Sequence, residues 1–373
     1  MQSARARAPL LTAVAVAAVS RLFVFVVAVV SASAFGERPS CSKCWNIQVP
    51  LVNLFSRYDS AYYVNIAWHG YENLIGPRWA FFPGYPIVIG SVGRLAALVS
   101  PLPLVLTLYV VGFAVSNIAF FGCIYYLYKL SIEVLGDKDL AFYSALCLAF
   151  YPAGVFLSAT YSESLFLLLM LSSLYYWRIG RFGITALLAF LEALTRPVGI
   201  LLVIPYLIDL ARGKAPRRTA SYLPIATTLL AFLSFLVFSQ LTAGTPFASF
   251  IAERLYWGIT PTLPLIAART YHAIIHNPIT VGCYLAIAIG GLLTSILRRK
   301  NDMEGTIDVY GLALLVTYPY AGLISVARYT VTLIPVYFGC ARWMQRSKTL
   351  TLAIFLILLA IGVGLFANWY RFY

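Results

Sequence analysis

Long apolar runs separated by short polar loops dominate this chain. The first run extends from about residue 9 to 35, and the later ones cover approximately 80–100, 103–130, 140–157, 163–178, 182–195, 197–211, 220–241, 278–297, 308–326, 329–345 and 349–368. A helix needs about 20 apolar residues to cross a bilayer. The pattern therefore predicts an all-α polytopic membrane protein, with one integral domain over residues 1–373.

Two longer stretches interrupt the pattern. Residues 36–79 form a polar, aromatic-rich loop, and residues 242–277 form a second stretch that we expect to be non-helical. Segment 80–100 contains Pro83, Pro86 and Arg94. These residues suit a helix that lies at the membrane interface, or re-enters from the outside, better than a helix that crosses.

The basic residues predict the orientation. If segment 80–100 does not cross, the basic loops at 212–218, 298–300 and 342–348 share one side of the membrane. That side then holds 16 Lys and Arg residues against 10 on the other side. Cytoplasmic loops carry such an excess. We therefore expect about eleven transmembrane helices, a large first extracytoplasmic loop at 36–79, and a C-terminus outside.

Composition supports a membrane protein and argues against a nucleic-acid partner. Hydrophobic residues make up 61% of the 373 residues, charged residues only 11%, and the formal net charge is +14. Because the basic residues lie in short loops, topology and the anionic membrane surface explain this charge. Cys41 and Cys44 form a Cys-x-x-Cys pair that suits a local disulfide in an oxidising compartment. No second ligand pair follows to complete a zinc site.

The first polar loop carries a candidate catalytic carboxylate. It reads FSRYDSAYYVNIAWHGY over residues 55–71 and continues as RWAFFPGYP over 78–86. Aromatic side chains around Asp59 would exclude water, form a wall for a sugar and raise the basicity of the carboxylate. The alternative is a structural ion pair between Arg57 and Asp59 within an interfacial aromatic belt. His69 suits either an acid, base or hydrogen-bond donor or a packed loop histidine.

A second group of polar residues lies in YPAGVFLSATYSESLF, residues 151–166. Ser162 suits a helix cap, and Glu163 then lies in the first helical turn, where the helix dipole favours a carboxylate. Arg196 and Arg328 each lie where two apolar segments meet on the outer side. The planar fork of an arginine binds phosphate well. The alternative is an arginine that extends to the lipid head groups.

These motifs together resemble a known family. RYDSAYYVNIAWHGY followed by AFFPGYP resembles the first luminal loop of the second GPI mannosyltransferase, the phosphatidylinositol-glycan class V type. The segment YPAGVFLSATYSESLF resembles the Tyr-Ser-Glu-Ser segment of that family, and LTRPVGI resembles its later Thr-Arg segment. The resemblance covers roughly residues 55–200, and Arg328 with Pro335 is a weaker match.

The resemblance implies a GT-C type glycosyltransferase fold and a polyprenyl-phosphate sugar donor, usually dolichyl-phosphate mannose. It assigns the catalytic aspartate to Asp59. The acceptor would be a lipid-linked glycan such as a GPI-type lipid, or a protein. The membrane would be that of the endoplasmic reticulum in a eukaryote or the cell membrane in a prokaryote, with the active site on the luminal or extracytoplasmic face. The candidate substrate-binding residues are Arg57, His69, Tyr71, Phe82, Pro83, Tyr161, Glu163, Arg196 and Arg328.

The expected reaction is an inverting sugar transfer. Asp59 would act as general base, and Arg196 or Arg328 would hold the donor phosphate. We expect no cofactor and no obligatory metal, because Asp59 is the one carboxylate at the centre of the first loop, although some enzymes of this fold use a divalent ion. The rival hypotheses are a transporter or flippase of a lipid-linked sugar and a non-catalytic membrane scaffold. Intramembrane acid pairs or broken helices repeated in two halves would favour a transporter, and the sequence contains neither.

Overall fold

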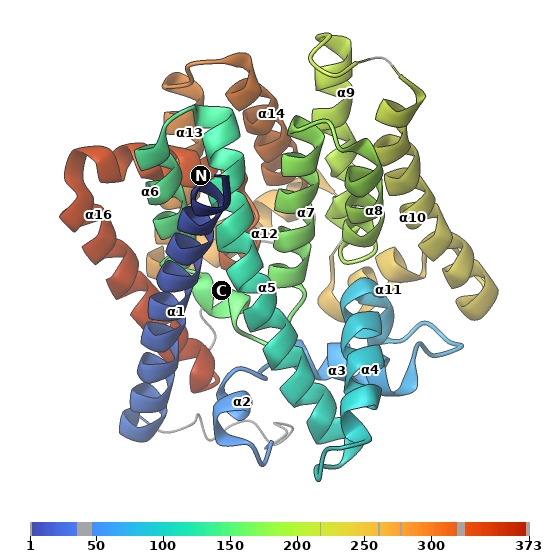
Figure 1. The fold of residues 1–373 in the computed structure, drawn as a ribbon. Coiled ribbons are helices and arrows are strands. Elements are labelled where there is room, and N and C mark those ends of the chain that lie inside the picture. Colours follow the sequence, from blue (N-terminus) through green and yellow to red (C-terminus); the bar gives the residue numbers. More distant parts are fainter. Residues whose placement is uncertain are drawn as a thin grey trace.

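The computed structural model describes residues 2–35, 47–216, 218–259, 262–276, 278–318 and 325–370. Within these residues every regular element is a helix (Figure 1). The α-helices are α1 (Gln2–Phe35), α2 (Pro50–Leu54), α3 (Ser60–His69), α4 (Gly84–Ala97), α5 (Leu104–Leu135), α6 (Lys138–Ala149), α7 (Glu163–Arg178), α8 (Phe182–Ala193), α9 (Val203–Ala211), α10 (Thr219–Ala243), α11 (Ala248–Trp257), α12 (Leu263–His276), α13 (Pro278–Leu297), α14 (Asp302–Thr317), α15 (Val326–Thr330) and α16 (Ile334–Ala367). Three 3₁₀-helices accompany them, η1 (Pro77–Ala80), η2 (Gly154–Leu157) and η3 (Pro197–Leu202). Cys41 and Cys44 lie outside the described residues.

The described part of the chain contains four helices long and apolar enough to cross a membrane. They are Val14–Phe35 of α1, then α5, α10 and α16. The chain is therefore an integral membrane protein, and the larger number of about eleven crossings stays a prediction. The interfacial placement of segment 80–100 also stays a prediction. Its helix, α4, has 14 residues and is about 21 Å long, less than the roughly 30 Å of a hydrocarbon core.

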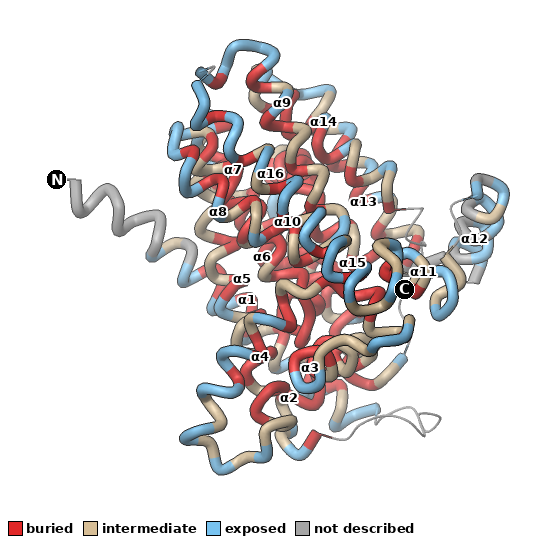
Figure 2. The backbone as a smooth tube through the Cα atoms, turned by 90° about the vertical axis from the view of Figure 1, so that its right-hand side faces the viewer, coloured by how far each residue is buried: buried red, intermediate tan, exposed pale blue. Residues whose placement is uncertain are grey.

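Helix α5 is the centre of the helix packing. It contacts α1, α4, α6 and α7, while α8 joins α7 to α10, and α16 joins α6 to α13. Buried residues run through the middle of this assembly (Figure 2). The short elements α2, α3 and α4 gather at one end, and the connections near α9 and before α14 lie at the other end (Figure 1). The first of these two ends carries Asp59 and the other candidate residues of the first polar loop.

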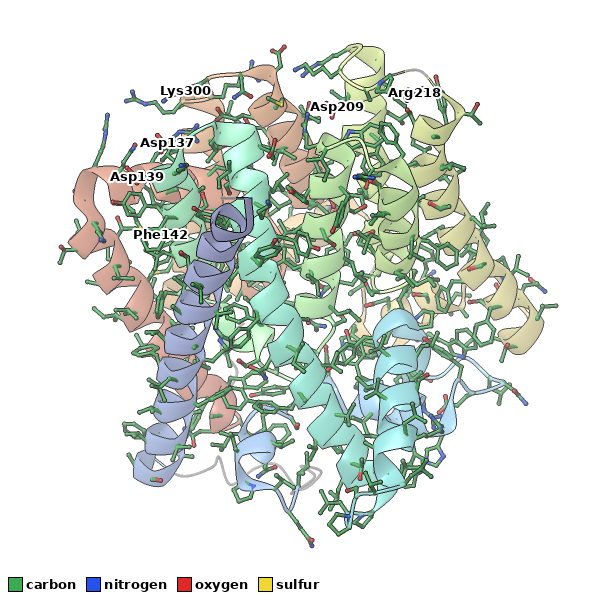
Figure 3. All side chains as sticks on the ribbon, viewed as in Figure 1. Asp137, Asp139, Phe142, Asp209, Arg218 and Lys300 are labelled. Carbon is green, nitrogen blue, oxygen red and sulfur yellow. The ribbon has the colours of Figure 1, made fainter. Side chains whose placement is uncertain are left out.

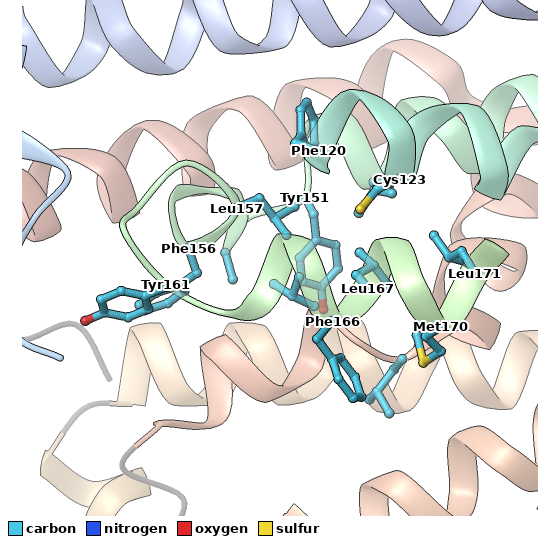
Figure 4. Close-up of a cluster of buried hydrophobic side chains, with 14 of the residues drawn as sticks. Phe120, Cys123, Tyr151, Phe156, Leu157, Tyr161, Phe166, Leu167, Met170 and Leu171 are labelled. Carbon is cyan, nitrogen blue, oxygen red and sulfur yellow. The ribbon is translucent and has the colours of Figure 1, made fainter. Parts of the chain in front are cut away.

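The predicted run 140–157 extends beyond its helix. Helix α6 ends at Ala149 rather than near residue 157, and the buried non-helical turn that follows carries η2. Figure 4 shows Tyr151, Phe156 and Leu157 of this turn inside the hydrophobic core. Because the turn is buried, its apolar residues prolong the run beyond the helix. The runs 329–345 and 349–368 belong mainly to α16, and the predicted gap between them agrees with the break of this helix at Ser347.

The stretch 242–277, expected to be non-helical, contains two helices. Helix α11 has 10 residues and α12 has 14 residues. Both are shorter than a membrane-spanning helix and mix polar with apolar residues, so their sequence does not form an apolar run. Helix α11 packs against η1 beside the first polar loop.

Candidate active site

A cavity of about 130 Å³ lies where six separated segments of the chain meet. Its wall contains carboxylates, guanidinium groups and aromatic rings. The polar and aromatic side chains used below are Asp59, Tyr63, Phe82, Arg196, Glu253 and Arg328. Four of these six, Asp59, Phe82, Arg196 and Arg328, are among the residues that the sequence nominated.

The backbone around Asp59 is held in an uncommon conformation. Tyr58 has a φ of +49°, in the left-handed region that non-glycine residues seldom adopt. Its ring packs on Phe366 and Trp369 at centroid distances of 5.7 and 5.1 Å. The backbone N–H of Asp59 donates to the hydroxyl of Tyr161 at 3.1 Å. These contacts fix the direction of the Asp59 carboxylate immediately before α3, and strained backbone of this kind is concentrated at functional sites.

Arg328 connects the carboxylates of Asp59 and Glu163, and Arg196 joins them through Glu163. Arg328 donates hydrogen bonds to Asp59, to Glu163 and to the hydroxyl of Tyr63, the last at 3.1 Å. Arg196 donates to the same oxygen of Glu163. The side chain of Glu163 is 0% exposed, and those of Arg328 and Arg196 are 10% and 11% exposed. The formal charge of these four groups sums to zero, which is how charges persist in a buried site.

Ser162 and Glu163 therefore do not have only the helix-capping role expected from the sequence. Ser162 occupies the N-cap position of α7 without a capping hydrogen bond from its side chain. Its hydroxyl is instead hydrogen-bonded to that of Tyr63 at 2.9 Å, so the predicted cap is wrong. The cause is the nearby polar cluster, which competes for the same hydroxyl. Arg196 and Arg328 likewise turn into the protein and bind carboxylates rather than extending to lipid head groups.

Arg57 points away from this cavity. Its Nε donates to the backbone oxygen of Ala367 at 3.1 Å, and its guanidinium lies 4.8 Å from the ring centroid of Trp369. It thus ties the first loop to the end of α16, while Asp59 pairs with Arg328 instead. The ring of Tyr161 packs against the guanidinium of Arg328, which lies 4.6 Å from the ring centroid.

The remaining nominated residues line a second, larger cavity of about 630 Å³ between α3, α4 and α10. His69 and Pro83 lie in its wall, and His69 stacks on Trp68 at a centroid distance of 4.2 Å. Tyr71 lines it as well and donates its hydroxyl to the backbone oxygen of Phe81 at 2.6 Å. Phe82 lines the smaller cavity and Pro83 the larger one, so the two cavities adjoin at this point of the chain.

Two further polar residues of the smaller cavity, Tyr63 and Glu253, were not predicted from the sequence. Tyr63 follows Asp59 by four residues, a spacing that places both on one face of a helix, and this signal could have revealed it. Glu253 carried no such signal, since α11 was not predicted. Trp257, one turn after Glu253, packs on Tyr62 and Phe81, each at 5.6 Å between centroids, and so holds α11 against the cavity.

Glu253 changes the electrostatics of the site. Helix α11 lies outside the membrane-spanning segments, and no ion pair of Glu253 is found within the part of the chain that the structure describes. Burial in the cavity wall, and then the negative charge of Asp59, raise the pKa of the Glu253 carboxyl to about 7. Such perturbed groups are concentrated at functional sites. The cavity thus holds a second carboxylate beside Asp59, and this carboxylate comes from α11 rather than from the first loop.

The arrangement of helices matches a solved oligosaccharyltransferase. The crystal structure of the Archaeoglobus fulgidus oligosaccharyltransferase in the apo form aligns with a TM-score of 0.51 and 13% sequence identity, over 95% of this chain and 56% of that chain. That protein has the GT-C fold, and the likeness assigns the same fold to the chain described here.

Sequence comparison assigns the chain to one family. A family model described as Mannosyltransferase (PIG-V) matches residues 22–261, more than half of the chain, and the chain belongs to this family. The family predicted from the loop motifs is therefore confirmed. The GPI alpha-1,6-mannosyltransferase 2 of Cricetulus griseus is 32% identical over 232 residues, 59% of this chain and 44% of that protein. The human protein of the same name is 33% identical over 204 residues, 54% of this chain and 40% of that protein. The chain thus spans less than half of the length of these curated relatives.

Proposed function

We propose that this protein is an inverting mannosyltransferase. It transfers mannose from a polyprenyl-phosphate donor, such as dolichyl-phosphate mannose, to a lipid-linked glycan of the GPI type. Family membership supports the transferred sugar, because the relatives are named mannosyltransferases. The observation that carries the proposal is that Arg328, which lines one cavity together with Asp59, binds both Asp59 and the fully buried Glu163.

Arg328 and Arg196 form the phosphate-binding part of this mechanism. Glu163 holds both guanidinium groups side by side, and both line the cavity. A guanidinium presents a planar fork that matches two phosphate oxygens. When the donor phosphate enters, Arg328 exchanges its hydrogen bond to Asp59 for one to the phosphate. The exchange frees the carboxylate of Asp59 at the moment when a base is needed.

Asp59 then acts as general base. The acceptor hydroxyl oxygen attacks the anomeric carbon of mannose, and the bond between this carbon and the phosphate oxygen breaks. Asp59 takes the proton of the attacking hydroxyl, and polyprenyl phosphate leaves as an anion. No general acid is required, because the departing phosphate is a stable anion that the arginines hold. The aromatic wall contributed by Phe82 and Tyr63 would face the sugar and exclude water.

The larger cavity gives the lipid portion of a substrate a place to lie. Its walls are mainly apolar and include Phe235 and Phe238 of α10. It adjoins the Asp59 cavity at Phe82 and Pro83, so a lipid chain there would leave its phosphate close to the arginines. The proposed reaction takes place at the luminal face of the membrane in a eukaryote, or at the extracytoplasmic face in a prokaryote. A transporter or flippase is not favoured, since the relatives are named transferases.

Purified protein and a synthetic donor test this function. The protein in detergent receives polyprenyl-phosphate [³H]mannose together with a GPI-type glycolipid acceptor, and the labelled glycolipid is separated from the donor. We expect labelled glycolipid and an equal amount of released polyprenyl phosphate. Movement of intact donor between the leaflets of proteoliposomes, without release of lipid phosphate, would instead identify a transporter.

A further inference from the structure

A basic cavity of about 440 Å³ lies at the other end of the molecule from Asp59. It is bounded by the end of α13, the beginning of α6 at Leu140, and the part of α16 just before the break at Ser347. Figure 3 places Lys300 at this end, together with Arg218 and Asp137, whereas α3 lies at the opposite end in the same view of Figure 1. The cavity is therefore separate from the proposed active site.

Four cations converge on this cavity with little compensating charge. Arg298 and Lys300 follow α13, and Arg342 and Arg346 come from α16. Arg342 binds the buried carboxylate of Glu304. Among the described residues no ion pair is found for Arg298, Lys300 or Arg346. Like charges this close repel one another, and an anion in the cavity would relieve that repulsion.

The rest of the cavity wall is apolar and fixed in position. Leu140, Leu297 and the ring of Trp343 line it. The indole N–H of Trp343 donates to the hydroxyl of Thr294 at 2.9 Å, so the ring is held against α13. Basic groups above an apolar wall, with a tryptophan at the boundary, match the boundary between head group and acyl chain of a phospholipid.

A general excess of positive charge on this side of the membrane does not explain the convergence. The positive-inside rule requires basic residues in the loops but does not direct their side chains to one cavity. Arg299 and Lys348 belong to the same two segments and turn elsewhere. Arg299 lies against Gly305 of α14, and the amine of Lys348 lies 5.8 Å from the ring centroid of Tyr143. Neither lines the cavity.

We propose that this cavity binds the phosphate of an anionic phospholipid from the leaflet at this end of the protein. Basic pockets between transmembrane helices bind anionic lipid head groups in this way. The recognised chemistry is a phosphate group, which free phosphate also offers. The apolar wall favours the lipid as its source.

Binding of short-chain lipids to the full-length protein tests the proposal. The protein in detergent is titrated with dioctanoyl phosphatidylglycerol, with dioctanoyl phosphatidylcholine and with inorganic phosphate, and the melting temperature is followed. We expect saturable stabilisation by phosphatidylglycerol alone. In the variant R298Q/R346Q its apparent affinity should fall about 30-fold, because each lost cation near an anionic lipid weakens binding about fivefold.

The control variant is R299Q/K348Q, which removes the same charge from the same two segments without touching the cavity. It should bind phosphatidylglycerol as the wild type does. Native mass spectrometry of the wild-type protein with the same lipids gives a reading that does not depend on any variant. Equal binding of the two lipids, equal weakening in both variants, or equal stabilisation by inorganic phosphate would each overturn the proposal.

Discussion

Replacing Glu163 by glutamine should destabilise the protein strongly. One oxygen of this buried carboxylate accepts hydrogen bonds from both Arg196 and Arg328. The substitution keeps the size of the side chain but changes the formal charge of the four-group cluster from zero to +1. Removing one partner from a buried ion pair typically costs about 3–5 kcal/mol, because the other charge stays buried without compensation. A carboxylate that only favours the beginning of a helix would contribute about 1 kcal/mol or less.

The chain offers a matched control for this experiment. Glu192 in α8 is also 0% exposed, and within the described residues neither of its carboxylate oxygens has a hydrogen-bond partner. The same substitution at Glu192 removes no ion pair, so it should leave stability unchanged or raise it. Thermal unfolding of E163Q and E192Q in the same detergent measures both effects. If E163Q had the melting temperature of the wild type while that of E192Q was lower, the ion-paired cluster would not stabilise this end of the protein.

Three further predictions concern the two arginines, Glu253 and the membrane topology. The variants R196K and R328K should each weaken donor binding in an equilibrium assay, because lysine keeps the charge but lacks the bidentate fork; unchanged affinity in both would remove the arginines from the phosphate site. Since the pKa of Glu253 is raised to about 7, the folded state favours its protonated form. The stability it contributes is complete below the ordinary carboxyl pKa and is lost as the pH rises through about 7. The variant E253Q should lack this decline in a series of melting temperatures against pH, and an identical decline would exclude Glu253 as its source. Cysteines placed near Lys138 should resist membrane-impermeant labelling from the side on which cysteines in the first loop react; labelling of both from that side would refute the predicted topology.

The apolar runs of the sequence predicted a helix correctly where the run and the helix cover the same residues. The run 163–178 matches α7 residue for residue, because charged residues, Glu163 and Arg178, stand at its two ends. The run 140–157 does not match α6, because the buried turn after Ala149 is as apolar as the helix itself. Hydropathy reports burial in membrane or protein, and it separates a helix from a turn only where their burial differs.

The sequence predicted residues of the candidate site, but not which of them form ion pairs with one another. Asp59, Glu163, Arg196 and Arg328 could be nominated because charged residues among aromatic and apolar ones need partners. Which partners they have depends on how α3, α7 and α15 pack, and the paired residues are separated by 33 to 269 positions in the chain. Local sequence contains no signal for such contacts, so the alternative ion pair of Arg57 with Asp59, the nearest partner in the chain, is wrong.

The central claim is that Asp59 accepts the proton of the acceptor during mannosyl transfer. The most direct test compares wild type with D59N in the same detergent, measuring donor binding and the rate of release of polyprenyl phosphate. Asparagine keeps the size of the side chain but cannot take the proton. We predict a rate about 10²–10⁴-fold lower in D59N with donor affinity near that of the wild type. A D59N protein that transfers mannose at the wild-type rate would contradict the claim.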